Sequence, residues 1–529
     1  MRLFIFLQFV VMTFLGGVSS QAATVVPLVE AARAGDEKEL RLLLSKAAEV
    51  DESTADGTTA LHWAVHRDEE KLIDLLLEHG ADATIANRYG VQPLTLAALN
   101  GSVPAIEQLL VSGAVPDTVM PGGETVLMTA ARGGIPGAVK LLLEHGADPN
   151  ARVEVTGQTA LMWAAARNNA SAIALLVDHG ADVAIRTPIH ESVSVRSYFS
   201  SPQPTGFTAL LFAVRAGQLD ATRALLDAGA DVNDTLSDGQ SALVVAAANA
   251  NWELASYLLE RGADPALSGA GWNALHQVIR TRRPNPSGGT PGPIPTGSVD
   301  SIDLVKKLIA SEIDINARMS RNGMKDGQRS RLNRLGATAF FLAAKNTDIE
   351  AMQALLDGGA DPLVASADGT TPLMVAAGIA IFIPGEDGGS LPGQEAEVLE
   401  AVRLCLDRGT DVNAVNDRGE TALHGAAFRG VNAVVDLLVD RGARLDSFTV
   451  EGWTPLALAN GLSYSDFYKS QSDTAGHLRA LMEARGLPTE GHDVDPAVCL
   501  DCFQTRPDQV RAARDRDEQM ALELEAGQR

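Results

Sequence analysis

Two cysteines near the C-terminal end of the chain, Cys499 and Cys502, have the spacing of a redox or metal-binding pair. Such a pair can cycle between a dithiol and a disulfide, or it can supply two of the four ligands of a zinc ion. Phe503 follows the pair, so the histidine needed for covalent haem attachment is absent. Zinc would need two more ligands, and His492 offers only one. The pattern therefore favours a small local disulfide or an idle thiol pair, and we expect no metal and no cofactor.

Basic residues gather in residues 318–335 around a single acid, Asp326. They are Arg318, Arg321, Lys325, Arg329, Arg331 and Arg334. One interpretation is a binding site for an anionic ligand or for an acidic protein surface. The alternative is a solvated loop, or a loop that folds back on acidic neighbours. Aromatic residues do not alternate with the basic ones, so a site for single-stranded nucleic acid is poorly supported.

Four aromatic residues are further candidates for partner binding. Tyr198 and Phe199 lie in a proline-containing stretch and could anchor a partner or pack on the adjacent loop. Trp63 and Trp163 occupy equivalent positions of two sequence repeats, where they could bind a partner or fill the core. Cys405 lies between Leu404 and Leu406, a setting typical of a buried and inert thiol.

The charge balance constrains the partner. The chain has 43 Lys and Arg residues against 67 Asp and Glu residues, a formal net charge of −24. This excess of negative charge repels nucleic acid and anionic lipid, so we expect a protein partner, one that could be cationic. The sequence has no phosphate-binding Gly-Lys-Ser/Thr loop, no Gly-x-Ser-x-Gly elbow and no His-Glu-x-x-His motif, and we expect no enzyme activity.

Residues 1–22 have the pattern of a secretory signal peptide. Arg2 supplies the positive charge, residues 3–15 are apolar, and residues 16–23 are mostly small. The apolar run is too short for a membrane span, and we expect cleavage after Ala22 or close to it. A retained N-terminal anchor is the alternative. The mature chain is expected to be exported, either periplasmic in a bacterium or secreted, with no stable membrane insertion.

A four-residue signature recurs along most of the chain at intervals that are mostly close to 33 residues. Its starts are Thr59, Gln92, Thr125, Thr159, Thr208, Ser241, Asn273, Thr338, Thr371, Thr421 and Thr454. A second signature, Gly-Ala-Asp, closes many of the units, as it does at Gly80 and Gly146. Two motifs that recur in register indicate a tandem repeat.

This repeat resembles the ankyrin repeat, in which a hairpin-like turn leads into two antiparallel helices. The resemblance implies an all-α solenoid of helix-turn-helix units with β-hairpin-like loops. The residues suit that fold, because Thr59 can cap a helix N-terminus and Gly80 can end a helix in the left-handed conformation. One unit buries too little apolar surface to be stable alone, so the units must stack.

The resemblance also divides the chain. Residues 25–52 look like an N-terminal capping unit, about eleven repeats follow in residues 53–486, and residues 487–529 form a tail with the cysteine pair. The stack is interrupted by insertions at residues 187–205, 281–298, 318–335 and 379–397. The first and third should project from the hairpin side, and the other two should lie between the helices of one repeat.

Ankyrin arrays as a class bind other proteins. The resemblance therefore implies an exported interaction scaffold, expected to be monomeric, that holds a protein through its concave groove and its hairpin-side loops. Two alternatives remain open. One is a redox or disulfide accessory protein that uses Cys499 and Cys502, and the other is an effector secreted toward another cell.

Overall fold

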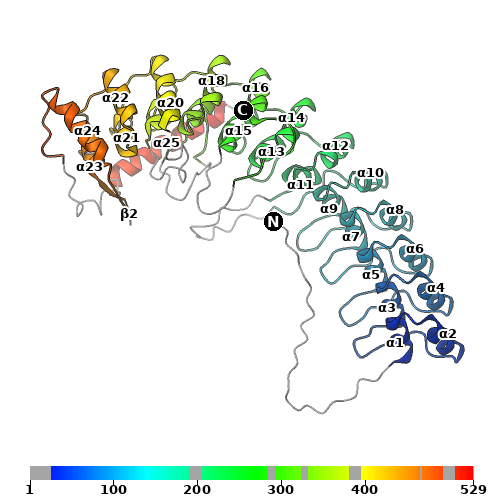
Figure 1. The fold of residues 1–529 in the computed structure, drawn as a ribbon. Helices are drawn as coiled ribbons and strands as arrows, with labels where there is room; N and C mark the ends of the chain where they lie inside the picture. The colour runs from blue at the N-terminus through cyan, green and yellow to red at the C-terminus, as the bar shows by residue number, and fades with distance from the viewer. Residues whose placement is uncertain are drawn as a thin grey trace, which may run out of the picture. The chain divides into compact units, whose positions relative to one another are not determined.

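The computed structural model describes most of the chain as stacked pairs of helices (Figure 1). The described residues are 26–189, 205–283, 292–311, 313–322, 332–379, 395–464, 467–492 and 507–527. They form two compact units, and the division runs through the repeat that contains α9 and α10. Residues 1–25, which include the expected signal peptide, lie outside the described part.

The first unit is a stack of short helix pairs. We call the first helix of each pair the inner helix and the second the outer helix. The inner helices are α1 (Pro27–Ala34), α3 (Ala60–His66), α5 (Pro93–Asn100), α7 (Val126–Gly133) and α9 (Ala160–Ala166). The outer helices are α2 (Glu37–Ser45), α4 (Glu70–Glu78), α6 (Val103–Val111), α8 (Pro136–Glu144) and α10 (Ala170–Asp178).

The second unit continues the same pattern. Its inner helices are α11 (Ala209–Arg215), α13 (Ala242–Ala248), α15 (Ala274–Arg282), α17 (Ala339–Lys345), α19 (Pro372–Ala377), α21 (Ala422–Arg429) and α23 (Pro455–Asn460). Its outer helices are α12 (Leu219–Asp227), α14 (Trp252–Glu260), α16 (Ser301–Ala310), α18 (Ile349–Asp357), α20 (Glu395–Asp407), α22 (Asn432–Asp440) and α24 (Ser472–Glu483). The expected all-α array of paired helices is confirmed.

The end of the stack departs from this pattern. A two-stranded antiparallel ladder of β1 (Leu462–Tyr464) and β2 (Phe467–Lys469) separates α23 from α24. One further helix, α25 (Pro507–Gly527), follows in the tail. Two of the expected insertions overlap helices of the stack. Helix α15 extends through Arg282, and α20 already begins at Glu395, so the ends of both insertions add residues to helices.

The core lies between neighbouring helix pairs and within each pair. In the repeat that begins at Thr59, the side chains of Leu61, Ala64 and Leu76 are at most 1% exposed. Ala64 has no bulk beyond its methyl group, so adjacent inner helices can approach closely. Gly80 follows the outer helix with a φ of +85°, a conformation that glycine adopts without steric cost.

The loops that precede the inner helices are hairpin-like. Isolated antiparallel bridges join Ser53 to Thr59, Val119 to Thr125 and Thr235 to Ser241. Backbone hydrogen bonds also join one hairpin loop to the next. The N–H of Arg88 donates to the carbonyl of Asp56 at 2.8 Å, for example, and the N–H of Asp417 donates to that of Asp368 at 2.9 Å.

Three signature histidines, His62, His276 and His424, link their inner helix to the following loop. The backbone N–H of Thr421 donates to Nδ1 of His424 at 3.1 Å, and Nε2 of His424 donates to the carbonyl of Trp453 at 3.1 Å. His62 and His276 make the same pair of contacts. Burial lowers the pKa of His276 and of His424 to about 4. These side chains are therefore neutral parts of the scaffold.

Acid should destabilise the stack through these histidines. An unfolded histidine binds a proton near pH 6.5, whereas His276 and His424 stay neutral in the folded chain down to about pH 4. The free energy of unfolding should therefore fall as the pH is lowered from about 6.5 to about 4, by up to roughly 3 kcal/mol for each histidine. Urea unfolding at several pH values measures this loss.

The matched control is His424→Met, because Met374 occupies the same position of another repeat and its sulfur accepts the N–H of Thr371 at 3.4 Å. The variant should lose less stability between pH 6.5 and pH 4 than the parent chain. An unchanged pH dependence would contradict the assignment.

Candidate interaction surface

The two tryptophans predicted from the sequence lie at half-buried positions on inner helices of the first unit. Each ring carries a guanidinium from the preceding inner helix. The guanidinium carbon of Arg33 lies 5.2 Å from the Trp63 ring centroid, and that of Arg132 lies 4.7 Å from the Trp163 centroid. Stacked cations hold the rings in place while leaving part of their surface accessible. The structure thus repeats one aromatic–arginine arrangement at two places in the unit.

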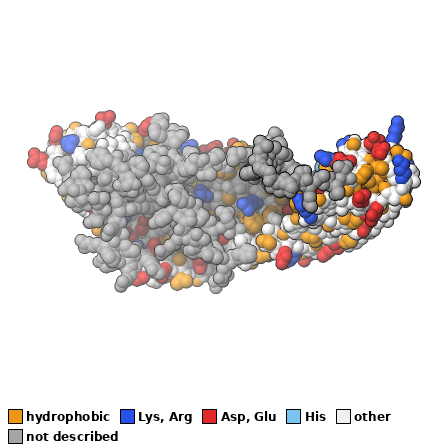
Figure 2. Space-filling view, turned by 90° about the horizontal axis from the view of Figure 1, so that it is seen from below, with side chains coloured by type: hydrophobic (Ala, Val, Ile, Leu, Met, Phe, Trp, Pro, Cys, Tyr) orange, Lys and Arg blue, Asp and Glu red, His pale blue; other side chains and the backbone are white. Residues whose placement is uncertain are grey.

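Apolar side chains are also exposed at the hairpin loops of this unit. The exposed fractions are 57% for Tyr89, 57% for Val119 and 80% for Val155, in three successive loops. Arg88 donates to the hydroxyl of Tyr89 at 2.6 Å, and its guanidinium lies over the ring. The space-filling view shows hydrophobic side chains among acidic and basic ones on this unit (Figure 2). Exposed apolar groups with a polar surround are typical of protein-binding surfaces.

The corresponding inner-helix positions of the second unit are covered from α13 onward, whereas Phe212 in α11 is half-exposed. The residues four places after the signature start are Trp63, Leu96, Thr129 and Trp163 in the first unit, and all but Thr129 are half-exposed. From α13 onward, the equivalent side chains of Val245, Gln277, Leu342, Val375 and Leu458 are each at most 7% exposed. Half-exposed aromatic rings at this position are therefore Trp63 and Trp163 in the first unit and Phe212 in the first repeat of the second unit.

The basic cluster of residues 318–335 is only partly a surface feature. The Arg318 guanidinium donates to the carbonyls of Gly336 and Ala365, at 2.9 and 2.7 Å, and so joins two hairpin loops. Arg334 is 1% exposed, which corrects its expected place in an open basic loop. The reason is local: Met319 and Ala337 share a backbone hydrogen bond of 2.9 Å, so both ends of the insertion fold back into a hairpin.

Arg321 of the cluster meets an acidic group. Its Nε lies 3.3 Å from Oε1 of Glu525 in α25. This contact matches the alternative in which the basic loop folds back on an acidic neighbour. The remaining predicted residues lie outside the described part of the chain, namely Lys325, Arg329, Arg331, Tyr198, Phe199, Cys499 and Cys502.

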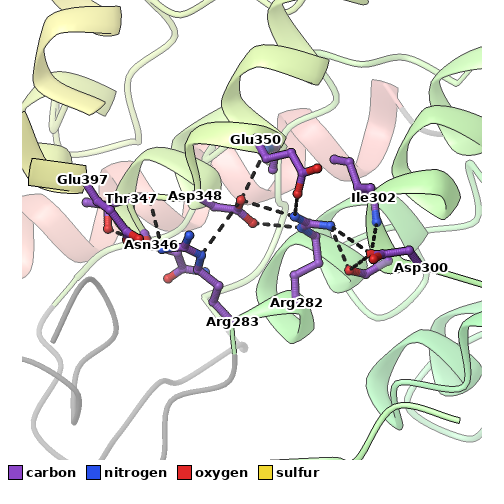
Figure 3. A network of polar contacts seen from close by, with 11 residues as sticks. Arg282, Arg283, Asp300, Ile302, Asn346, Thr347, Asp348, Glu350 and Glu397 are labelled. Atoms are coloured by element: carbon purple, nitrogen blue, oxygen red, sulfur yellow. Dashed lines mark hydrogen bonds and ion pairs between the residues drawn. The ribbon is translucent and has the colours of Figure 1, made fainter. Parts of the chain in front are cut away.

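A buried ionic network, which the sequence analysis missed, links three repeats of the second unit (Figure 3). The Arg282 side chain is 8% exposed and its Nε lies 2.9 Å from Oδ2 of Asp348, which is 1% exposed. Arg282 also pairs with Glu350 at 2.8 Å, while Arg283 pairs with Glu397 at 2.6 Å. The sequence signal was the basic end of α15, and its acidic partners lie one and two signature starts further along the chain. The network lies where residues are inserted between α15 and α16, and it holds the helices around that insertion together.

Two further chemical features of the described part bear on the candidate sites. No three His, Cys, Asp or Glu side chains within it are grouped as a metal site requires. Burial raises the pKa of the Cys405 thiol to about 12, so this cysteine is protonated and inert. None of the described helices has the length and apolar character needed to cross a bilayer.

Comparison with known families agrees with the geometry. A family model described as ankyrin repeats (3 copies) matches residues 28–120, 94–187, 189–269, 210–285 and 394–469, which together make up more than half of the chain. The chain belongs to the ankyrin-repeat family. Ankyrin repeats imply a scaffold for protein–protein interaction.

Individual curated proteins are similar to part of this chain. Mouse B-cell lymphoma 3 protein homolog is 30% identical over 165 residues, which are 27% of this chain and 37% of that protein. The Caenorhabditis elegans homolog of transient receptor potential cation channel subfamily A member 1 is 25% identical over 158 residues, 30% of this chain and 12% of that protein. The chain thus spans well under half the length of these relatives.

A solved structure of the human ASB11 ankyrin repeat domain is also similar. It is 24% identical, with a TM-score of 0.37, and the match covers 45% of this chain and 99% of that domain.

Removal of Arg282 should destabilise the second unit. Arg282→Met leaves Asp348 buried without its closest cation, so the free energy of unfolding should fall by about 3 kcal/mol. Urea unfolding measures the loss, with Arg403→Met as the control because Arg403 and Glu400 form an exposed pair. The control should change stability by less than about 1 kcal/mol.

The double variant Arg282→Met/Asp348→Asn separates charge from packing. Asparagine removes the unpaired buried charge. The free energy of unfolding of the double variant should therefore fall by less than the sum of the losses in Arg282→Met and Asp348→Asn. Additive losses would show that the two side chains do not act as a pair.

Proposed function

We propose that this ankyrin-repeat protein is an exported scaffold that binds a protein partner through the inner helices and hairpin loops of its first unit. The observation that carries the proposal is the half-exposed pair of Trp63 and Trp163. Large aromatic side chains with a stacked arginine provide much contact area at little cost in conformational entropy, and such residues dominate binding energy at protein interfaces.

The hairpin loops extend this surface. Tyr89, Val119 and Val155 project from rigid, hydrogen-bonded loops, so a partner can bury them without ordering a flexible segment. The net charge of −24 favours a partner with a cationic surface, since long-range attraction speeds the encounter.

Export is part of the proposal and rests on the sequence of residues 1–22. The positive n-region, the short apolar run and the small residues before Ala23 match the requirements of a cleaved signal peptide. The periplasm of a bacterium, or the medium around the cell, is the compartment proposed for the mature chain.

The partner-binding surface is tested by paired truncation. Trp63→Ala/Trp163→Ala should reduce partner recovery from a cell-envelope extract by at least about tenfold, because each ring supplies roughly 1–2 kcal/mol of binding free energy. Quantitative pull-down with the mature chain gives the measurement. Val111→Ala is the matched control, since Val111 is 75% exposed on outer helix α6.

The control should bind like the parent chain, and circular dichroism should show unchanged helix content in all variants. Equal recovery with the tryptophan variant and the control would reject the first-unit surface as the binding site.

Processing is tested by the mass of the chain purified from its native host. The expected mature N-terminus is Ala23 or a residue close to it, and fractionation should place this form outside the cytoplasm. An intact N-terminus on a cytoplasmic chain would rule out export and leave the scaffold proposal unaffected.

A further inference from the structure

The C-terminal helix α25 lies against hairpin loops of its own second unit (Figure 1). Arg516 pairs with Asp417 at 2.6 Å, and Nδ2 of Asn333 donates to Oδ2 of Asp517 at 3.1 Å. Glu525 lies 3.3 Å from Arg321, as described above. These contacts follow one another along the helix and reach the loops that precede α21 and α17.

One face of α25 makes these contacts. Asp517, Met520, Ala521, Leu524 and Glu525 are half-buried, whereas the side chains between them are exposed, including Leu522 at 68%. The half-buried positions recur every three or four residues, which is the period of one side of a helix. The helix therefore has a defined side toward the loops.

Two ion pairs set the order of charges along α25. Its N-terminal half has as many Asp as Arg residues, and within it Arg516 meets the acidic loop of Asp417. Its C-terminal half contains Glu518, Glu523 and Glu525, and Glu525 meets the loop of Arg321. The negative end of the helix dipole also lies near Arg321, which favours the same direction. This order fixes the direction of the helix on the loops.

The lengths agree with this arrangement. Residues 516 to 525 span about 14 Å along a helix axis. The loops of Asp417 and Arg321 belong to repeats that are separated by one further repeat, and packed helices lie about 8–10 Å apart. The side chains of α25 and of the loops bridge the difference between the helix length and the spacing of the loops. Beyond Glu525, a cleft of about 390 Å³ extends to the loop that contains Ser268.

The docking is not optimised. Oδ1 of Asp517 is buried and has no hydrogen-bond partner in the described part of the structure. Burial raises the pKa of Asp517, and the nearby carboxylates of Asp368 and Asp417 raise it further. A buried acceptor without a partner costs free energy, so the helix is held less tightly than its ion pairs alone would allow. Weak binding of this kind is what we expect of a helix that a partner can displace.

We propose that Asp417, Asn333 and Arg321 form a binding site for a helix that presents an arginine to Asp417 and, nine residues later, a carboxylate to Arg321, and that α25 occupies this site in cis. A partner helix with the same order of charges would bind there by displacing α25. This site belongs to the second unit and differs from the surface proposed for the first. The test below uses no outside partner, so its result is independent of that proposal.

The experiment measures binding of a fluorescently labelled peptide of residues 507–527 to the full chain by anisotropy. The parent chain should bind it weakly, because its own α25 occupies the loops. The full-chain variant Arg516→Glu should bind the same peptide at least about tenfold more tightly, since repulsion from Asp417 displaces its α25. Hydrogen exchange of residues 507–527 should rise in this variant.

Two further variants test which residues of α25 pair with which residues of the loops. Arg516→Glu/Asp417→Arg in the full chain restores an ion pair with reversed signs, so peptide binding should return to the weak level of the parent. Asp517→Asn should slow hydrogen exchange of α25, because it removes the repelled charge and adds a donor.

Glu525→Gln and Glu523→Gln form a matched pair, with the same chemical change on the docked and the exposed side of α25. Only Glu525→Gln should raise hydrogen exchange in the helix. Equal peptide binding by the parent and Arg516→Glu, or equal exchange in the two glutamine variants, would overturn the proposal.

Discussion

A pair of short helices cannot cover its own apolar faces, so each pair in this chain buries them against the next pair. Leu61 and Leu76 are almost fully buried, but their cover comes from neighbouring repeats as well as from their own. This nearest-neighbour burial makes the alignment of successive inner helices the condition for everything else. Threonine caps, bridging histidines and loop-to-loop hydrogen bonds all maintain that alignment.

Inserted residues can separate successive inner helices, and the structure shows two ways in which their alignment is maintained. At residues 318–337, the ends of the insertion pair as a hairpin, and Arg318 bonds to the next loop. Between α15 and α16, a buried network of Arg282 and Asp348 links helices that the inserted residues would otherwise separate. Polar groups replace part of the lost apolar contact, and they require complete pairing to do so.

The two units present different surfaces to a partner. In the first, Trp63 and Trp163 remain half-exposed beside stacked arginines, and the hairpin loops expose apolar side chains. In the second, the equivalent inner-helix positions from α13 onward are covered, and α25 lies on the loops. In our proposals, one fold thus offers an accessible surface in one unit and an occupied one in the other.

The sequence by itself determined the repeat, its fold and most of its capping chemistry. These follow from local signals: Thr59 caps a helix and Gly80 ends one because of preferences that act within a few residues. The burial of Cys405 was likewise predictable from its apolar neighbours. Spacing also placed Trp63 and Trp163 at equivalent positions, although it could not tell how much of each ring stays exposed.

Only the tertiary structure decided which charged residues face solvent. Arg318 and Arg334 looked like members of one open basic loop, yet the first bonds to loop carbonyls and the second is buried. The pairing of Arg282 with Asp348 spans 66 residues, and that of Arg321 with Glu525 spans 204. Such partners are brought together by stacking, and no local pattern in the chain specifies which acid will meet which base.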